Sequence, residues 1–313
     1  MAGVLSGFAT IAIIIAVGWV LAHTKVLDAR AQVVLARLTF HAGTPALMIT
    51  MIGSSDVHRL FSANLIASVT GVVVTAVLSV LASRLAFRRD ARDTVIGAFC
   101  SSYVNAGNLG IPIAAYAIGD AAVLAPMLLV QILVLQPGGL AILDALDGQQ
   151  SGRFGAGMMI RSALLRPIRN PITIGAAIGV LLAVTGWQPP AVIMDPIGLI
   201  GGLAIPCMLI GYGVSLRTGP VPGRGERPAQ LAVITALKLV VQPLVAGLVA
   251  ALALGLTGPA LLAVVIIAAL PTAQNVFVFA VRYDAGVVLA RDSVFLTTVL
   301  SVPVILLITA LLA

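Results

Sequence analysis

The sequence has very little charge and few aromatic residues. Of its 313 residues, 9% are charged and 5% are aromatic, whereas 60% are hydrophobic, and the mean hydropathy is +1.13. A soluble domain of this size would carry roughly a quarter charged residues. The many small and aliphatic residues suit packed helices better than the alternating strands of a barrel. We therefore expect an all-α protein that crosses a membrane many times.

Cysteine and histidine are also scarce, which removes several kinds of site. The two cysteines, Cys100 and Cys207, lie inside apolar runs, and we interpret them as packing residues rather than as a disulfide or metal pair. The three histidines, His23, His41 and His58, all fall in the first fifth of the chain, and there is no HExxH motif. We expect no cofactor and no metal site.

Ten apolar runs approach the roughly 20 residues that a helix needs to cross a bilayer. A polar stretch, 144–169, separates the fifth run from the sixth, and we interpret it as a cytoplasmic linker between a first repeat, 1–143, and a second, 170–313. Five helices in each half would give the halves opposite orientations, as in inverted-repeat transporters. The runs are approximately 3–22, 35–53, 61–83, 94–118, 121–143, 170–187, 191–213, 229–253, 258–281 and 292–312.

The positive charges gather on one side of this topology. Apart from Arg59 and Lys238, every Lys and Arg lies in an odd-numbered loop or its flanks. Cytoplasmic loops carry an excess of Lys and Arg, so we expect a multi-pass protein of the inner (plasma) membrane with both termini outside the cytoplasm. The net charge of +7 is then a topological signal and does not indicate nucleic-acid binding.

Two pairs of segments match between the halves. Residues 42–49 resemble residues 203–210, and the polar interruption at 105–112 corresponds to 271–275 near the middle of the ninth run. Paired hydrophobic segments interrupted by Gly or Pro mark the binding site of inverted-repeat carriers.

The first interruption should break its helix. Pro112 removes a helical hydrogen bond, and Gly107 and Gly110 tolerate a distorted backbone. Freed backbone groups in hydrocarbon would each cost several kcal/mol, so the break must be buried in protein or line a wet cavity. The amides of Asn105 and Asn108 could meet those groups or a ligand. A proline kink satisfied by its own polar neighbours is the alternative, which the second interruption, with Pro271, Gln274 and Asn275, disfavours.

Lys238 lies in the middle of the eighth run, about 15 Å deep at 1.5 Å per residue. A lysine at that depth costs about 2.5 to 3.5 kcal/mol on insertion scales and normally faces a cavity or a partner. We interpret it as a cation for an anionic substrate; a side chain that reaches the interface is the alternative. No acidic residue occupies a comparable depth, and the sequence does not identify a coupling ion, H⁺ or Na⁺.

The motifs at the two interruptions resemble those of a known family. The pattern Asn105-x-x-x-x-Gly110-Ile-Pro112, together with Pro271 and the segment Phe277-Val-Phe-Ala280, is similar to the auxin efflux carriers, whose bacterial members are commonly named malonate or malate carriers. The resemblance covers the whole chain in length, number of spans and central linker.

The resemblance implies a fold like that of the bile acid sodium symporters. Helices 1, 2, 6 and 7 would form a scaffold, and helices 3–5 and 8–10 a transport domain in which broken helices 4 and 9 cross. Substrate would bind beside the crossing and move by an elevator displacement in a homodimer. On this resemblance Asn105 contacts the ligand, Pro112 marks the first break, and Asn275 and Val276 mark the second. Val276 stands where a proline is common in the family.

These observations predict a secondary carrier of small organic anions, mono- or dicarboxylates such as malonate or malate. An ion channel or a membrane receptor is the alternative, and an intramembrane enzyme is a further one, for which Asp144 and Asp147 are the one close acid pair within reach of a span. The expected substrate-binding residues are Asn105, Asn108, Lys238, Gln274 and Asn275.

Overall fold

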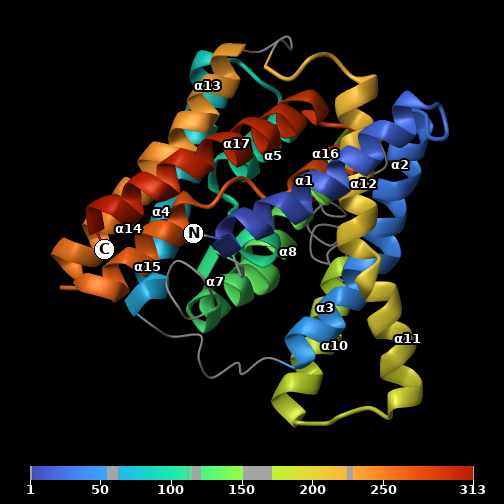
Figure 1. Ribbon diagram of the computed structural model, residues 1–313, viewed down its shortest axis with the longest axis horizontal. Coiled ribbons are helices and arrows are strands. Elements are labelled where there is room, and N and C mark those ends of the chain that lie inside the picture. Colours follow the sequence, from blue (N-terminus) through green and yellow to red (C-terminus); the bar gives the residue numbers. More distant parts are fainter. Residues whose placement is uncertain are drawn as a thin grey trace.

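The structure is a computed structural model that describes residues 2–54, 63–110, 113–114, 121–150, 171–223 and 228–312. Throughout these ranges the regular elements are helices, and a single isolated β-bridge joins two irregular segments. The helices pack in two groups, which Figure 1 shows side by side.

The first group is held together by small residues at the helix contacts. An added Cβ at Gly175 of α10 would lie 2.5 Å from the carbonyl oxygen of Pro45 in α3, and one at Gly213 of α12 would overlap the carbonyl oxygen of Ile15 in α1. Small residues let helix backbones approach closely where lipid supplies no hydrophobic drive. The group consists of α1 (Ala2–His23), α2 (Ala29–Leu38), η1 (Thr39–Gly43), α3 (Thr44–Gly53), α10 (Pro171–Thr185), α11 (Ala191–Gly202) and α12 (Ala204–Thr218).

The second group is larger and contains both interrupted helices. Its α4 packs on α5, α14 and α15, and α15 packs on α17. Its elements are α4 (Ala63–Leu81), η3 (Ala82–Ala86), α5 (Ala91–Ser102), η4 (Ala106–Gly110), η6 (Ala121–Leu124), α7 (Ala125–Val130), η7 (Gln131–Leu135), α8 (Gln136–Gln150), α13 (Pro228–Ala236), η8 (Leu237–Val241), α14 (Gln242–Leu248), η9 (Val249–Ala253), α15 (Gly258–Ala269), α16 (Asn275–Tyr283) and α17 (Val287–Leu312).

The two groups divide the chain in the way that the resemblance assigns scaffold and transport helices. The first group contains the segments of expected helices 1, 2, 6 and 7, and the second contains the others. In Figure 1, α2, α3, α10, α11 and α12 lie on one side, and α4, α13, α14, α15 and α17 lie on the other.

Six of the described helices are long and apolar enough to cross a membrane, which supports a multi-pass membrane protein. Their lengths run from 22 to 28 residues. The expected number of ten spans and the inverted repeat stay predictions. The six helices are Ala29–Gly53, Leu65–Ala86, Pro126–Asp147, Ala191–Thr218, Pro228–Ala253 and Val287–Leu312, and shorter apolar helices cover Ala9–His23, Pro171–Thr185 and Gly258–Ala269.

The first residues of the expected linker are helical, and the division of the chain into two repeats and a linker stays a prediction. Helix α8 does not end at residue 143 but continues to Gln150. Residues 151–169, which make up most of the expected linker, lie outside the described ranges.

Candidate functional site: a cavity at the crossing of two interrupted helices

Two irregular segments cross near the centre of the second group. Helix α5 ends at Ser102 and α15 ends at Ala269, and an antiparallel bridge pairs Val104 with Thr272 beyond these ends. The backbone N–H of Asn105 donates to the carbonyl of Pro271 at 2.8 Å, and the N–H of Ala273 donates to the carbonyl of Tyr103 at 3.1 Å. Each break therefore satisfies backbone groups of the other, as a membrane interior requires.

Side chains add further hydrogen bonds to the crossing. Asn105 Nδ2 donates to Gln274 Oε1 at 2.6 Å, and Gln131 Nε2 donates to the carbonyl of Val104 at 2.9 Å. On the other segment, the N–H of Thr272 donates to Thr297 Oγ1 at 3.0 Å. These bonds fix the first segment to η7 and the second segment to α17.

The first break begins earlier than the glycines and the proline of the motif. Residues 103–105 are the irregular segment, and Gly107 and Gly110 already belong to η4. Gly110 serves close packing, because an added Cβ there would lie 3.0 Å from Leu270. Pro112 lies outside the described residues, as does the side chain of Asn108.

The second break lies where the sequence indicated it, with one difference. Pro271 is inside the irregular segment 270–274. Val276 is the second residue of α16, so the break ends before it and not at it. Because α16 starts at Asn275, no proline is needed at position 276 to interrupt the helix.

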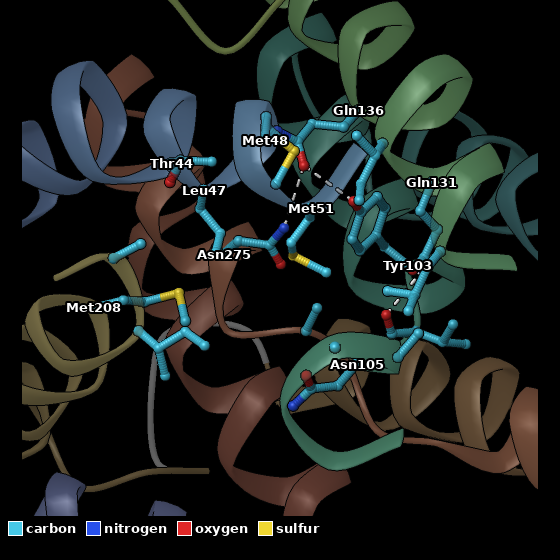
Figure 2. A pocket seen from close by; sticks show the side chains of 18 of the residues that line it. Thr44, Leu47, Met48, Met51, Tyr103, Asn105, Gln131, Gln136, Met208 and Asn275 are labelled. Atoms are coloured by element: carbon cyan, nitrogen blue, oxygen red, sulfur yellow. Dashed lines mark hydrogen bonds between the residues drawn. The ribbon is translucent and has the colours of Figure 1, made fainter. Parts of the chain in front are cut away.

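A cavity of about 230 Å³ lies beside the crossing, between the two helix groups. Figure 2 shows Thr44, Met48 and Met208 on one side, and Tyr103 and Asn105 on the other. The first group contributes Thr39, Thr44, Leu47, Met48, Met51, Ala204, Ile205 and Met208, and the second contributes Tyr103, Val104, Asn105, Ala106, Gly107, Leu128, Gln131, Ile132, Gln136, Ala273 and Asn275.

Gln136 is the centre of the polar wall of this cavity. Its Oε1 accepts hydrogen bonds from the hydroxyl of Tyr103 at 3.1 Å and from Asn275 Nδ2 at 3.4 Å. Its Nε2 has no hydrogen-bond partner within the described part of the chain, although the residue is only 1% exposed. Thr39 Oγ1, contributed by the first helix group, likewise has no hydrogen-bond partner within the described part of the chain, and this residue is 2% exposed. Buried polar groups are nearly always paired, so these atoms point to a bound ligand or water.

The lining contains no charged side chain among the residues described. Of the expected binding residues, Asn105 and Asn275 line the cavity, and Gln274 lies behind the lining and accepts a hydrogen bond from Asn105. Lys238 lies outside the lining, and its Nζ donates to Gln242 Oε1 and to the carbonyl of Ala268. The structure thus brings the two asparagines together and places the lysine in a separate cluster.

Asp144 and Asp147, the acid pair that an intramembrane enzyme would use, each contact a neighbouring helix. Asp144 Oδ1 accepts a hydrogen bond from the hydroxyl of Tyr283 at 2.8 Å. Asp147 Oδ1 lies 3.5 Å from Arg92 Nη1, on the surface. This arrangement joins α8 to α16 and α5.

Five polar residues of the site were not singled out from the sequence: Thr39, Thr44, Tyr103, Gln131 and Gln136. For the two glutamines a signal was present, because they interrupt the apolar run 121–143 five residues apart. For Thr39 and Tyr103 no local pattern distinguishes them from packing residues, since their role depends on which helices meet.

Comparison with known proteins decides the class. The family described as "Membrane transport protein" matches residues 4–309. The chain belongs to this family. The match confirms the resemblance to the auxin efflux carriers and indicates that the chain is a membrane transporter.

Two relatives of this membrane transport protein cover most of its length. A protein of Rhizobium meliloti (strain 1021) with the name "Putative malonate transporter" is 26% identical over 260 residues, which is 82% of this chain and 80% of the relative. An "Uncharacterized transporter" of Methanothermobacter thermautotrophicus (strain Delta H) is 23% identical over 298 residues, which is 93% of each chain.

Proposed function

We propose that this transporter is a secondary carrier of small organic anions and that it binds them in the cavity at the crossing. The observation that carries the proposal is the buried Nε2 of Gln136, a donor without a partner in the described structure. The name of the Rhizobium relative favours a malonate-like dicarboxylate as the substrate.

Neutral donors can hold a carboxylate in this cavity. A hydrogen bond to a charged group contributes about 1.5 to 3 kcal/mol, more than a bond between neutral groups. Gln136 Nε2 and Thr39 Oγ1 are available for such bonds. Helix α16 begins at Asn275, on the cavity wall, and a helix N-terminus carries partial positive charge. The volume of about 230 Å³ suits an acid of few carbons.

The position of the cavity supports alternating access by an elevator movement. Both helix groups contribute to the lining, so a displacement of the second group along the first would carry the substrate with it. We propose an inner-membrane homodimer with both termini outside the cytoplasm. Asn105 and Asn275 are the proposed contacts, Gln274 orients Asn105, and Asn108 remains a predicted contact.

Flux into proteoliposomes tests the function. The purified transporter should take up labelled malonate or another small carboxylate with saturation, whereas neutral malonamide should not compete. Saturation also separates a carrier from an ion channel and from a receptor.

Gln136→Glu is the variant that tests the site. It places a negative charge on the cavity wall, and we expect carboxylate uptake to fall at least tenfold. Gln230→Glu is the matched control, because Gln230 is equally buried, lies outside the cavity lining and accepts a hydrogen bond from Arg89 Nε. Equal uptake by the Gln136→Glu protein and the wild type would contradict the proposed site.

A further inference from the structure

Lys238 is completely buried, and its ammonium group binds oxygen atoms of the protein. Its Nζ lies 2.6 Å from Gln242 Oε1 and 3.0 Å from the carbonyl oxygen of Ala268, in the last turn of α15. The exposed fraction of the residue is 0%. The lysine sits in the π-helical segment η8, one turn before Gln242.

Gln242 extends this contact to the other interrupted helix. Its Nε2 donates at 3.0 Å to the carbonyl oxygen of Ser102, the last residue of α5. The ammonium of Lys238 and the amide of Gln242 therefore form one cluster that binds the C-terminal carbonyls of both α5 and α15. Gly71 of α4 makes room for it, since an added Cβ would lie 3.1 Å from the carbonyl oxygen of Gln242.

The two helix ends need a positive charge at this place. A helix C-terminus is equivalent to about half a negative charge, so two ends that converge amount to about one. In carriers with interrupted helices, the C-terminal carbonyls of half-helices coordinate Na⁺ or H⁺. Here a side chain of the protein supplies the charge.

Among the described elements that pack around η8, no carboxylate lies near the cluster to compete for the ammonium. The sequences of α4, α13, α14 and α15, all packed around η8, contain neither Asp nor Glu. In α5, Asp93 lies nine residues before Ser102, about 13 Å along the helix. In α17, Asp292 binds the guanidinium of Arg291 and the N–H of Gly223.

We propose that the Lys238 ammonium is a cation built into the crossing, at the place where Na⁺ would otherwise bind between the two helix ends. Wild-type protein then has no Na⁺ site there, and its transport does not require Na⁺. Removing the ammonium leaves Gln242 Oε1 and the carbonyl of Ala268 without their cation, so Lys238→Met should create a Na⁺ site. The Na⁺ independence of transport rests on the proposed function. The binding of Na⁺ by the Lys238→Met protein does not.

Thermal unfolding of the purified protein tests the binding statement. Wild type and Lys238→Met are compared in NaCl and in choline chloride at the same ionic strength. Lys25→Met is the matched control, because Lys25 is exposed and is the other of the two lysines in the chain. We expect a saturable rise of the unfolding temperature of Lys238→Met with Na⁺, by roughly 2 to 4 °C, since a ligand that binds only the folded state stabilises it. Wild type and Lys25→Met should unfold at the same temperature in both salts.

Two outcomes would overturn the proposal. One is a saturable stabilisation of the wild type by Na⁺. The other is a Lys238→Met protein that unfolds at the same temperature in both salts or fails to fold in both, because Na⁺ then does not replace the ammonium.

Malonate flux in the same salts gives the second readout. The wild-type rate should be equal in NaCl and choline chloride, and the Lys238→Met rate should rise at least tenfold in NaCl. If the wild type carries no carboxylate in either salt, the proposed function fails, while the unfolding temperatures still decide whether Lys238 acts as the cation of the crossing.

Discussion

Asn105 Nδ2 lies 2.6 Å from Gln274 Oε1, although the two residues are 169 positions apart in the sequence. Each is the last irregular residue before a helical segment, Asn105 before η4 and Gln274 before α16. The hydrogen bond therefore joins the two places where the interrupted helices resume. It also fixes the Asn105 amide at the wall of the cavity.

Replacing Asn105 by Ala should weaken substrate binding about tenfold while the protein still folds. A buried hydrogen bond whose partner is left unsatisfied costs about 1 to 3 kcal/mol. Competition binding with labelled malonate measures the change. Thr75→Ala is the control, because Thr75 is equally buried but lies in α4 and outside the cavity lining. Unchanged affinity of the Asn105→Ala protein would limit this residue to a structural role.

Gly179→Leu should disrupt the packing of α10 on α3 and lower the unfolding temperature by several degrees. An added Cβ would lie 2.8 Å from both the Ile52 side chain and the carbonyl oxygen of Met48, and overpacking of this kind costs about 1 to 3 kcal/mol. Gly198→Leu in α11 is the control, because no atom lies within 4 Å of its added Cβ. A Gly179→Leu protein as stable as the control would show that the two helices can separate without loss.

A cross-link between the helix groups should stop transport if the second group moves along the first. Phe40 of the first group and Tyr283 of the second lie with their ring centroids 6.2 Å apart, whereas Gly53 and Leu182 pack together within the first group, and none of the four residues lines the cavity. Cysteine pairs at these positions, joined by a bifunctional maleimide in a Cys207→Ala background, should block malonate flux for the first pair only. Undiminished flux with positions 40 and 283 joined would exclude the elevator movement.

The orientation predicts which loops react from the cytoplasm. Cysteines introduced at Ser151 and Arg224, which both fall in predicted cytoplasmic loops, should react with a membrane-impermeant maleimide only after the cells are opened. Reaction at Ser151 in intact cells would reverse the proposed topology and remove the basis for the inverted repeat.

Much of the fold was predictable because the membrane restricts what a sequence can do. Low charge predicted the class of protein, and the Gly- and Pro-containing interruptions predicted both breaks. The limits of the first break were not predictable, since α5 ends at Ser102 through contacts that Pro271 and Ala273 make from the other half of the chain. Local propensity points to Gly107 and Gly110, but tertiary pairing decides where the helix ends.

The site was predictable in part, because polar residues stand out in apolar membrane segments. Asn105 and Asn275 are polar residues at the breaks, and both line the cavity. The burial of Lys238 follows from its depth, whereas its binding to the carbonyl of Ala268 depends on how η8 packs against α15. Gln136 is a polar residue in an apolar run, which the sequence shows. Its hydrogen-bond partners, Tyr103 and Asn275, come from other elements and could not be predicted from the sequence.

The bridge between Val104 and Thr272 has a consequence for the evolution of such proteins. Its hydrogen bonds join main-chain groups, donated by the N–H groups of Asn105 and Ala273. Substitution of a side chain leaves these donors intact unless the new residue is proline, which has no N–H. The main-chain pairing therefore survives substitution of Val104 or Thr272, so two relatives can share this geometry after the letters at these two positions have ceased to match.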